Sequence, residues 1–397
     1  MALSPPSSPY ATNPAPLSAH VPEMNPRAFS LWLLLAVCAW AGEPGIALAV
    51  RGTVFTGPLS LDQRGLAVGG TVLSVDDLAA AAFPSPVAVP SWMDQGAVSV
   101  KGDQLRGLPR SFAKDQLEFT SDALGPISLT SAKLAGIVLS PVRFTALEAL
   151  LRGKPGALLL NGDRSEGSLA FLNAEMVGID NGRRIVQVPR SRVVAVVLRP
   201  VETGVPAKPR LWLRLVNGDR LGGEAWEPLA SALSLETGFG SFTIPGPALA
   251  AITVEGGRLM PLTSLTPLRL AAKDRLGNEL QASRDAAMHG GWLAAGGLRG
   301  ERGLQLPARS EGAWPVAGYA VFLAWAGCPA DSTAGQVQVL LDGQVAWDSG
   351  PMLPGQSARP IEVQLKGARE LVLLSLPAAD GETLLRSAAV CSPVLVK

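Results

Sequence analysis

Residues 337–350, VQVLLDGQVAWDSG, decide the fold of the C-terminal third of this 397-residue chain. Apolar and polar residues alternate along the stretch, and the Asp342-Gly343 pair lies near its centre. Alternation with a period of two predicts half-buried strands, and Asp-Gly favours the two positive φ angles of a tight hairpin turn. We therefore expect a β-hairpin, with one strand on each side of this pair.

Further strand signals surround the hairpin. Residues 319–327 (YAVFLAWAG) form an apolar run in which Tyr319 and Trp325 share one face and alternate with small residues, so we expect both rings in the core. Residues 361–365 (IEVQL) alternate cleanly, and residues 371–376 (LVLLSL) follow a Lys-Gly-Ala turn. Strands of this number and spacing predict two packed antiparallel sheets, a jelly roll.

The hairpin and its flanks resemble a known family, the NPCBM module, a carbohydrate-binding module first described in glycoside hydrolase family 98. Residues 260–267 (MPLTSLTP) resemble its lead-in, and residues 297–304 (GLRGERGL) resemble its glycine-bounded first strand. The resemblance covers residues 258–397 and implies a jelly-roll fold. It also implies a glycan or an envelope polysaccharide as the partner, and we expect no cofactor.

Carbohydrate modules stack the C–H faces of sugars on exposed aromatic rings and hold the hydroxyl groups with planar polar side chains. Side chains of both kinds lie on the predicted hairpin and on a later loop. Trp347 fits a sugar platform and core packing equally well, because it lies one residue from a polar turn. Two further aromatic candidates, Trp292 and Trp314, lie at the start of the module. The candidate ligand-binding residues are Trp347, Asp342, Asp348, Ser349, Asp380 and Glu382.

The chain departs from the NPCBM pattern at three polar positions. A Gly-x-His-Ser turn is replaced by residues 304–310 (LQLPARS), an acidic residue by Cys328-Pro329, and an Asp-His…Asp-Trp pattern by residues 384–389 (LLRSAA). A fold tolerates such changes better than a binding site does. A second interpretation therefore stays open, a structural or protein-interaction protein of the envelope whose jelly roll no longer binds sugar.

A repeat precedes the module. The tetrapeptide NGDR at residues 161–164 recurs at residues 217–220, and Gly182 matches Gly238 at the same offset of 56 residues. Several matches at one offset are stronger evidence for a repeat than the motif alone. With two looser copies upstream, the predicted boundaries are residues 50–92, 93–145, 150–202 and 208–257.

Each copy is expected to form five short strands. An apolar strand runs into an Asn-Gly-Asp or Lys-Gly-Asp turn, and an apolar β-branched run closes the copy. This order predicts a small bent sheet of the SH3-like or Sm-like kind. The predicted fold class is therefore all-β, with tandem small β-modules followed by a jelly-roll β-sandwich.

The turn sequence resembles repeats of exported planctomycete proteins. The resemblance implies that the repeats act as a scaffold or as a surface that contacts other envelope proteins. A Ca²⁺ loop would need more oxygen ligands than the single carboxylate that each turn offers. We therefore expect a structural turn and no metal site.

The composition argues against several functions. The 34 Lys and Arg residues balance 33 Asp and Glu residues without a basic stripe, so nucleic acid is not an expected partner. The chain has only two histidines, His20 and His289, which nearly excludes His-based catalysis and His-ligated metal sites. A glycoside hydrolase needs a pair of carboxylates in the cleft of a large domain, and no acidic pair stands out. We predict that the protein is not an enzyme and has no catalytic residue.

Residues 1–49 are predicted to be a signal-peptide region. Residues 29–41 (FSLWLLLAVCAWA) are too short to span a bilayer but suit the apolar core of a secretory signal. Residues 47–49 (ALA) and 39–41 (AWA) are candidate cleavage sites, and Met24 is a candidate for the true start. We expect export to the periplasm, the cell surface or the medium, with an uncleaved interfacial anchor as the alternative.

Cleavage would leave two cysteines, Cys328 and Cys391, each at the end of an apolar run. In an oxidising compartment they are candidates for a disulfide, which would close a loop of about 60 residues and stabilise the fold by about 4 kcal/mol. Two buried thiols are the alternative, because the sequence does not show whether their Cβ atoms meet.

Overall fold

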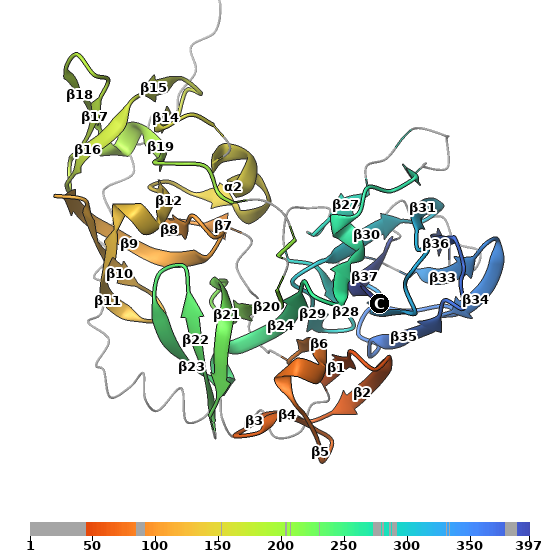
Figure 1. Cartoon of the computed structure of the whole chain (residues 1–397). Helices are drawn as coiled ribbons and strands as arrows, with labels where there is room; N and C mark the ends of the chain where they lie inside the picture. Colours follow the sequence, from red (N-terminus) through yellow and green to blue (C-terminus); the bar gives the residue numbers. More distant parts are fainter. Residues whose placement is uncertain are drawn as a thin grey trace, which may run out of the picture. The chain divides into compact units, whose positions relative to one another are not determined.

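The computed structural model of this protein describes residues 45–84, 92–151, 153–202, 205–206, 208–229, 231–272, 279, 282–285, 287, 292–330, 332, 334–377 and 387–397. Within these residues strands dominate and α2 (Phe144–Leu151) is the one α-helix, which confirms the predicted all-β class (Figure 1). No helix in the described part of the chain is long and apolar enough to cross a membrane. The predicted signal segment and His289 lie outside the described residues.

Residues 45–255 contain four β-repeats built on one plan, named repeats 1 to 4 in chain order (Figure 1). Their strands join in one 19-stranded sheet, apart from a separate three-stranded sheet in repeat 1. In each repeat the first strand pairs with both the second strand and the last strand. Repeat 1 consists of β1 (Gly45–Ala49), β2 (Thr53–Gly57), β3 (Leu59–Asp62), β4 (Gly65–Val68), β5 (Thr71–Leu73) and β6 (Leu78–Ala82). Repeat 2 consists of β8 (Gly96–Ser99), β9 (Gln104–Ala113), β10 (Gln116–Ser121), β11 (Gly125–Thr130) and β12 (Leu134–Val138).

The later repeats follow the same order, and a 3₁₀ turn precedes the last strand of every repeat: η1 (Val75–Asp77), η2 (Ser131–Lys133), η3 (Arg190–Arg192) and η4 (Gly246–Ala248). Repeat 3 consists of β14 (Gly156–Leu159), β15 (Arg164–Glu166), β16 (Ser168–Leu172), β17 (Met176–Asp180), β18 (Ile185–Pro189) and β19 (Val193–Val197). Repeat 4 consists of β20 (Arg210–Leu215), β21 (Arg220–Pro228), β22 (Ala232–Thr237), β23 (Ser241–Pro245) and β24 (Leu249–Glu255). The short strands β7 (Trp92–Met93) and β13 (Val142–Arg143) pair with each other, and α2 follows β13 directly in sequence.

A glycine turn ends the first strand of every repeat. The glycine has a positive φ between 87° and 95°, and its N–H donates to the carbonyl three residues earlier. A residue with a Cβ adopts this conformation only with strain, which explains the glycine in the Asn-Gly-Asp motif. The four glycines are Gly52, Gly102, Gly162 and Gly218.

The repeats are joined in two ways. The last strands pair edge to edge, β6 of repeat 1 with β24 of repeat 4, and β12 of repeat 2 with β19 of repeat 3. Repeats 2 and 4 pair at one position of β9 and β21, where Gln104 lies opposite Arg220, and they also exchange hydrogen bonds through the carboxylates of their turns. Asp103 accepts from the backbone N–H of Gly222 at 2.6 Å and of Gly238 at 2.9 Å, and Asp219 accepts from the N–H of Arg106 at 2.6 Å.

Residues 45–49 belong to the first repeat in the structure. Residues 45–49, assigned from sequence to the signal-peptide region, form β1, whose side chains are at most 3% exposed and which pairs with β2 and β6. The first repeat therefore includes residues 45–49 in the structure. A run of small apolar residues suits a cleavage site and a buried strand equally well, and only the tertiary contacts distinguish the two.

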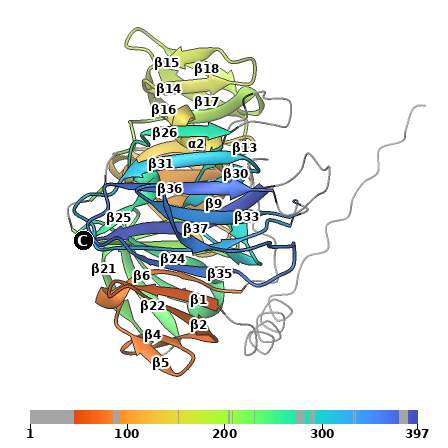
Figure 2. The same cartoon turned by 90° about the vertical axis from the view of Figure 1, so that its right-hand side faces the viewer.

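The C-terminal region is a sandwich of two antiparallel sheets (Figure 2). One sheet has the order β26 (Arg269–Ala272), β31 (Ser310–Pro315), β36 (Glu370–Leu376), β33 (Gln336–Leu341) and β34 (Gln344–Asp348). The other has the order β27 (Ser283–Arg284), β30 (Gly303–Pro307), β37 (Ser387–Val396), β32 (Val321–Gly327) and β35 (Arg359–Gln364), with β25 (Leu259–Pro261) on β37. The short elements η5 (Leu262–Ser264), β28 (Ala294–Ala295) and β29 (Leu298–Arg299) complete the region.

The hairpin predicted from sequence is β33–β34, and Asp342 and Gly343 have φ angles of 47° and 85°. Between the sheets lies an apolar core that includes Trp314 and Phe322. Trp325 is also fully buried, as predicted, and the ring of Tyr319 packs against the edge of the core.

Of the two alternatives left open for Cys328 and Cys391, the structure shows buried thiols without a bond between them. Cys391 of β37 lies directly opposite Trp325 of β32. Cys328 instead contacts the carbonyl of Ser387, which precedes Cys391 by four residues on β37. Four strand residues span about 13 Å, and a disulfide requires Cα atoms within about 7 Å. Cys328 also faces the core between the sheets, which does not include Cys391. Burial raises the pKa of the Cys391 thiol well above its usual value.

Buried ion pairs join repeat 4 to the sandwich. Glu301 is 4% exposed, accepts from Nε of Arg214 at 2.6 Å, and also accepts from Arg220. Burial raises the pKa of Glu301, but the charges of Arg214 and Arg220 outweigh this effect and hold it below its usual value. A second pair connects Arg302 with Glu255 at the end of β24. Repeat 4 and the sandwich therefore share a continuous polar interface.

Candidate functional site

The carboxylate of Asp342 anchors the hairpin turn to the neighbouring strand. It accepts from the backbone N–H of Arg369 at 3.1 Å and of Glu370 at 2.9 Å, where β36 begins. The side chain is exposed, so its remaining acceptor positions face solvent. Asp342 therefore has a structural role and also lies at the surface.

Asp348 and Ser349 hold the other end of the hairpin. Asp348 accepts from the side-chain amides of Gln336 at 2.9 Å and Gln338 at 2.7 Å. Burial alone would raise its pKa, but these amides and the N–H of Gly350 outweigh burial and hold the pKa of Asp348 below its usual value. Ser349 is buried, and its hydroxyl accepts from the N–H of Val337 at 2.9 Å. The polar atoms of both residues serve the fold.

The aromatic candidates pack within the protein. Trp347 is half-buried and contacts the core between the sheets, and Trp314 is 1% exposed. The guanidinium of Arg214 lies 3.5 Å from the ring centroid of Trp292. Trp347 and Asp348 are neighbours on β34 and so point to opposite faces of the sheet. The remaining two candidates, Asp380 and Glu382, lie outside the described residues.

A groove of about 460 Å³ lies on the outer face of the five-stranded sheet. Its floor is apolar and comes from outward-facing positions of β33 and β36, namely Leu340, Val372 and Leu374. Leu340 pairs with Val372 and, on the other side, with Val345, which is 57% exposed. The floor therefore continues as an apolar row to the edge strand β34.

The rim of the groove is charged. Arg269 on β26 forms ion pairs with Glu311 on β31 and, at 2.8 Å, with Glu370 on β36. Asp342 and Gly343 line the end of the groove at the hairpin turn. An apolar floor with guanidinium and carboxylate groups around it can contact both the C–H face and the hydroxyl groups of a sugar.

Of the predicted ligand-binding residues with described positions, the structure places Asp342 in the groove. The floor was missed because Leu340 and residues 371–376 were predicted only as strand residues, without an assignment of their side chains to a face. The sequence carried a signal, since LVLLSL and Leu340-Leu341 are apolar at successive positions and a strand turns successive side chains to opposite faces. Such a run implies an apolar outer face as well as an apolar inner face.

The sandwich region matches a known protein family. Residues 263–388 match the family described as the NPCBM/NEW2 domain. No curated protein matches the chain. The matched residues lie within the sandwich region.

Two solved structures from Clostridium perfringens are among those that the chain resembles. One is the CBM51 module of a GH95 protein in complex with methyl-galactose, at 18% identity, 35% coverage of this chain, 99% coverage of that chain and a TM-score of 0.31. The other is the M60 catalytic domain of ZmpB with two CBM51 domains, at 14% identity, 79% coverage of this chain, 32% coverage of that chain and a TM-score of 0.33. The chain thus spans about a third of the length of the second structure.

Proposed function

We propose that this chain is an exported, non-catalytic protein whose sandwich binds a glycan at the cell envelope. The observation that carries the proposal is the match of residues 263–388 to the NPCBM/NEW2 domain, because these residues form the sandwich that bears the groove. The repeats are proposed to act as a scaffold and to contact other envelope proteins. No cofactor or metal is required for this role.

The groove supplies the chemistry that the proposal needs. The row of Val345, Leu340 and Val372 gives an aliphatic surface across three adjacent strands, and the ion-paired carboxylate of Glu311 can accept from a hydroxyl group. Charge-assisted hydrogen bonds are roughly twice as strong as neutral ones. The Arg269 pairs keep the rim groups in place before the ligand arrives, which lowers the entropic cost of binding.

A glycan array probed with the full chain tests this function. We expect a small set of related glycans to bind, and Leu340→Asp to abolish the signal because it places a charge on the groove floor. The matched control is Leu160→Asp, at a position that is 63% exposed in the turn of repeat 3 and remote from the sandwich in sequence. Equal loss in both variants, or no loss in Leu340→Asp, would reject the groove as the site.

A second function is favoured by the internal hydrogen bonds of Asp342, Asp348 and Ser349. These polar groups stabilise the hairpin, so the sandwich can persist as a structural or protein-interaction module without sugar binding. An array without any bound glycan, together with covalent cross-linking of the repeats to an envelope protein in intact cells, would support this alternative.

A further inference from the structure

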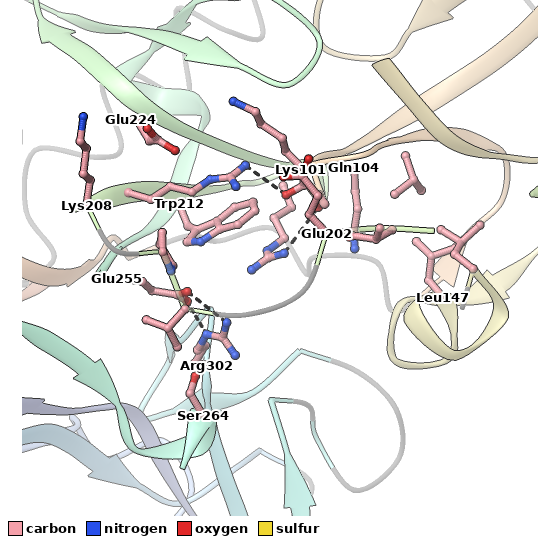
Figure 3. A pocket seen from close by; sticks show the side chains of 18 residues that line it. Lys101, Gln104, Leu147, Glu202, Lys208, Trp212, Glu224, Glu255, Ser264 and Arg302 are labelled. Carbon is pink, nitrogen blue, oxygen red and sulfur yellow. Dashed lines mark hydrogen bonds and ion pairs between the residues drawn. The ribbon is translucent and has the colours of Figure 1, made fainter. Parts of the chain in front are cut away.

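A cavity of about 780 Å³ lies outside the sandwich groove (Figure 3). Repeat 2, the helix α2 and repeat 4 line most of it, and Ser264 and Arg302 of the sandwich region contribute to its wall. A volume of this size lies within the range of about 300–1,000 Å³ that is usual for small-molecule sites. The glycan-binding proposal does not use this cavity.

Trp212 of β20 forms a wall of the cavity (Figure 3). The indole is 5% exposed, and the guanidinium groups of Arg210 and Arg220 lie 4.2 Å and 3.6 Å from its ring centroid. Two cations over one ring fix its orientation through cation–π attraction. The indole Nε1–H is the hydrogen-bond donor that Trp212 can offer to a ligand.

Three buried polar atoms in the cavity wall have no hydrogen-bond partner within the described part of the chain. They are Oε1 of Gln104, Nε of Arg210 and Nε1 of Trp212, on residues that are 7%, 9% and 5% exposed. A buried polar atom without a partner costs about 1–3 kcal/mol, so three of them in one cavity wall are unusual. Two of these atoms are donors and one is an acceptor.

The donors and the charges both favour an anion. Arg302 forms an ion pair with Glu255, and Arg220 shares Glu301 with Arg214, whereas Arg210 pairs with Asp103 only at 3.9 Å. The carboxylate of Asp103 is already held by backbone N–H groups of repeat 4. Burial lowers the pKa of Arg210, as expected for a guanidinium that lacks a close anion.

Two further cations, Lys101 and Lys208, line the cavity and form no ion pair among the described residues. Glu202 and Glu224 are the carboxylates of the lining other than Glu255. An oxyanion can accept from Arg210 and Trp212 together, whereas Gln104 Oε1 needs a donor such as a hydroxyl group. The unpaired atoms therefore favour a ligand that carries both an oxyanion and a hydroxyl group.

We propose that this cavity binds a small hydroxycarboxylate of the sugar-acid class. The carboxylate accepts from Nε of Arg210 and Nε1 of Trp212, and a ring hydroxyl donates to Oε1 of Gln104. This site is separate from the groove on the sandwich, and the proposal does not depend on glycan binding there.

Isothermal titration of the full chain with sodium D-galacturonate tests the proposal, with D-galactose and inorganic phosphate as comparison ligands. We expect saturable binding of galacturonate at one site, and at least tenfold weaker binding of galactose, which lacks the carboxylate, and of phosphate, which lacks the sugar hydroxyls. Absence of saturable galacturonate binding would overturn the proposal. An affinity for galactose or phosphate that equals the affinity for galacturonate would also overturn it.

Variants locate the site. Gln104→Glu keeps an oxygen acceptor but adds a negative charge that repels the carboxylate of the ligand. Trp212→Phe removes Nε1–H while keeping a ring for the two guanidinium groups. Each is expected to weaken galacturonate binding at least tenfold, while Gln187→Glu, the same change at an exposed position of β18, leaves it unchanged. Thermal unfolding of each variant checks the fold, and Gln104→Glu decides alone if Trp212→Phe does not fold.

Unchanged galacturonate affinity in a folded Gln104→Glu variant would overturn the assignment to this cavity. The groove variant Leu340→Asp separates the two sites, because it is expected to retain galacturonate binding. Loss of galacturonate binding in Leu340→Asp with retention in Gln104→Glu would assign the ligand to the sandwich and contradict the proposal.

Discussion

Asp103 and Asp219 occupy the same position of the turn in repeats 2 and 4, and each accepts a hydrogen bond from the backbone N–H three residues beyond the other. The two N···O distances, from Gly222 to Asp103 and from Arg106 to Asp219, are both 2.6 Å. Both carboxylates are 0% exposed. The Gly-Asp turns of repeats 2 and 4 therefore join the two repeats. The turn sequence alone does not predict this role.

Asp103→Ala is expected to destabilise the protein by about 2–4 kcal/mol, because it leaves the N–H groups of Gly222 and Gly238 buried without partners. The matched control is Asp163→Ala in repeat 3, where the equivalent carboxylate is exposed and accepts from its own neighbour Asn161 at 2.7 Å. For the control we expect less than about 1 kcal/mol. Urea unfolding of both variants measures the difference, and equal values would show that the exchange between repeats does not stabilise the fold.

Asp219 is expected to make stability depend on pH below neutrality. Burial raises the pKa of its carboxyl from 3.8 to about 6 in the folded protein. Because the folded state holds this proton more tightly than the unfolded state, Asp219 contributes stability below about pH 4. That contribution is lost as the pH rises through 6, and it amounts to about 3 kcal/mol at 1.36 kcal/mol per pKa unit.

The variant Asp219→Asn removes this titration. Between pH 4 and pH 7, the unfolding free energy of the wild type is expected to fall by about 2.4 kcal/mol relative to that of Asp219→Asn. Thermal or urea unfolding across that range measures it. A difference that is constant with pH, or one that grows in favour of the wild type, would contradict the raised pKa.

Glu301→Gln is expected to weaken the interface between repeat 4 and the sandwich by about 3–5 kcal/mol. The substitution leaves Arg214 and Arg220 buried without their shared anion, and breaking one side of a buried ion pair has a cost of this size. Glu362→Gln, on the exposed side of β35, is the matched control and should change stability by less than about 0.5 kcal/mol. Urea unfolding measures both, and a similar small effect in each would contradict a stabilising role of Glu301.

The mature N-terminus is expected to follow residues 39–41 if the proposed export is correct. Cleavage after residue 49 would remove β1, which pairs with β2 and β6 and is buried along its length. N-terminal sequencing of the protein recovered outside the cytoplasm measures the position. A mature chain that begins at residue 50 would contradict the role of β1 in the folded protein.

The sequence predicted the elements whose signals are local. Asp342-Gly343 specified a turn, and alternating residues specified the strands on either side of it. The contacts of Asp103 could not be predicted, because its partners lie 119 and 135 residues away and depend on how two repeats meet. Trp347 and Asp348 looked alike as ligand-binding candidates, but the pleat sends one side chain to the core and the other to the outer face. Register and face likewise separate Cys328 from Cys391, and the sequence does not show either of them.

The central claim is that the groove beside Asp342 binds a glycan. Its most direct test is the affinity of the strongest array glycan for the wild type, Glu311→Gln and Glu362→Gln, measured by isothermal titration. Glu311→Gln removes the charge of a rim acceptor and is expected to weaken binding about tenfold, which corresponds to about 1.4 kcal/mol, while Glu362→Gln on the opposite sheet leaves it unchanged. Equal affinities for all three proteins would contradict binding in the groove.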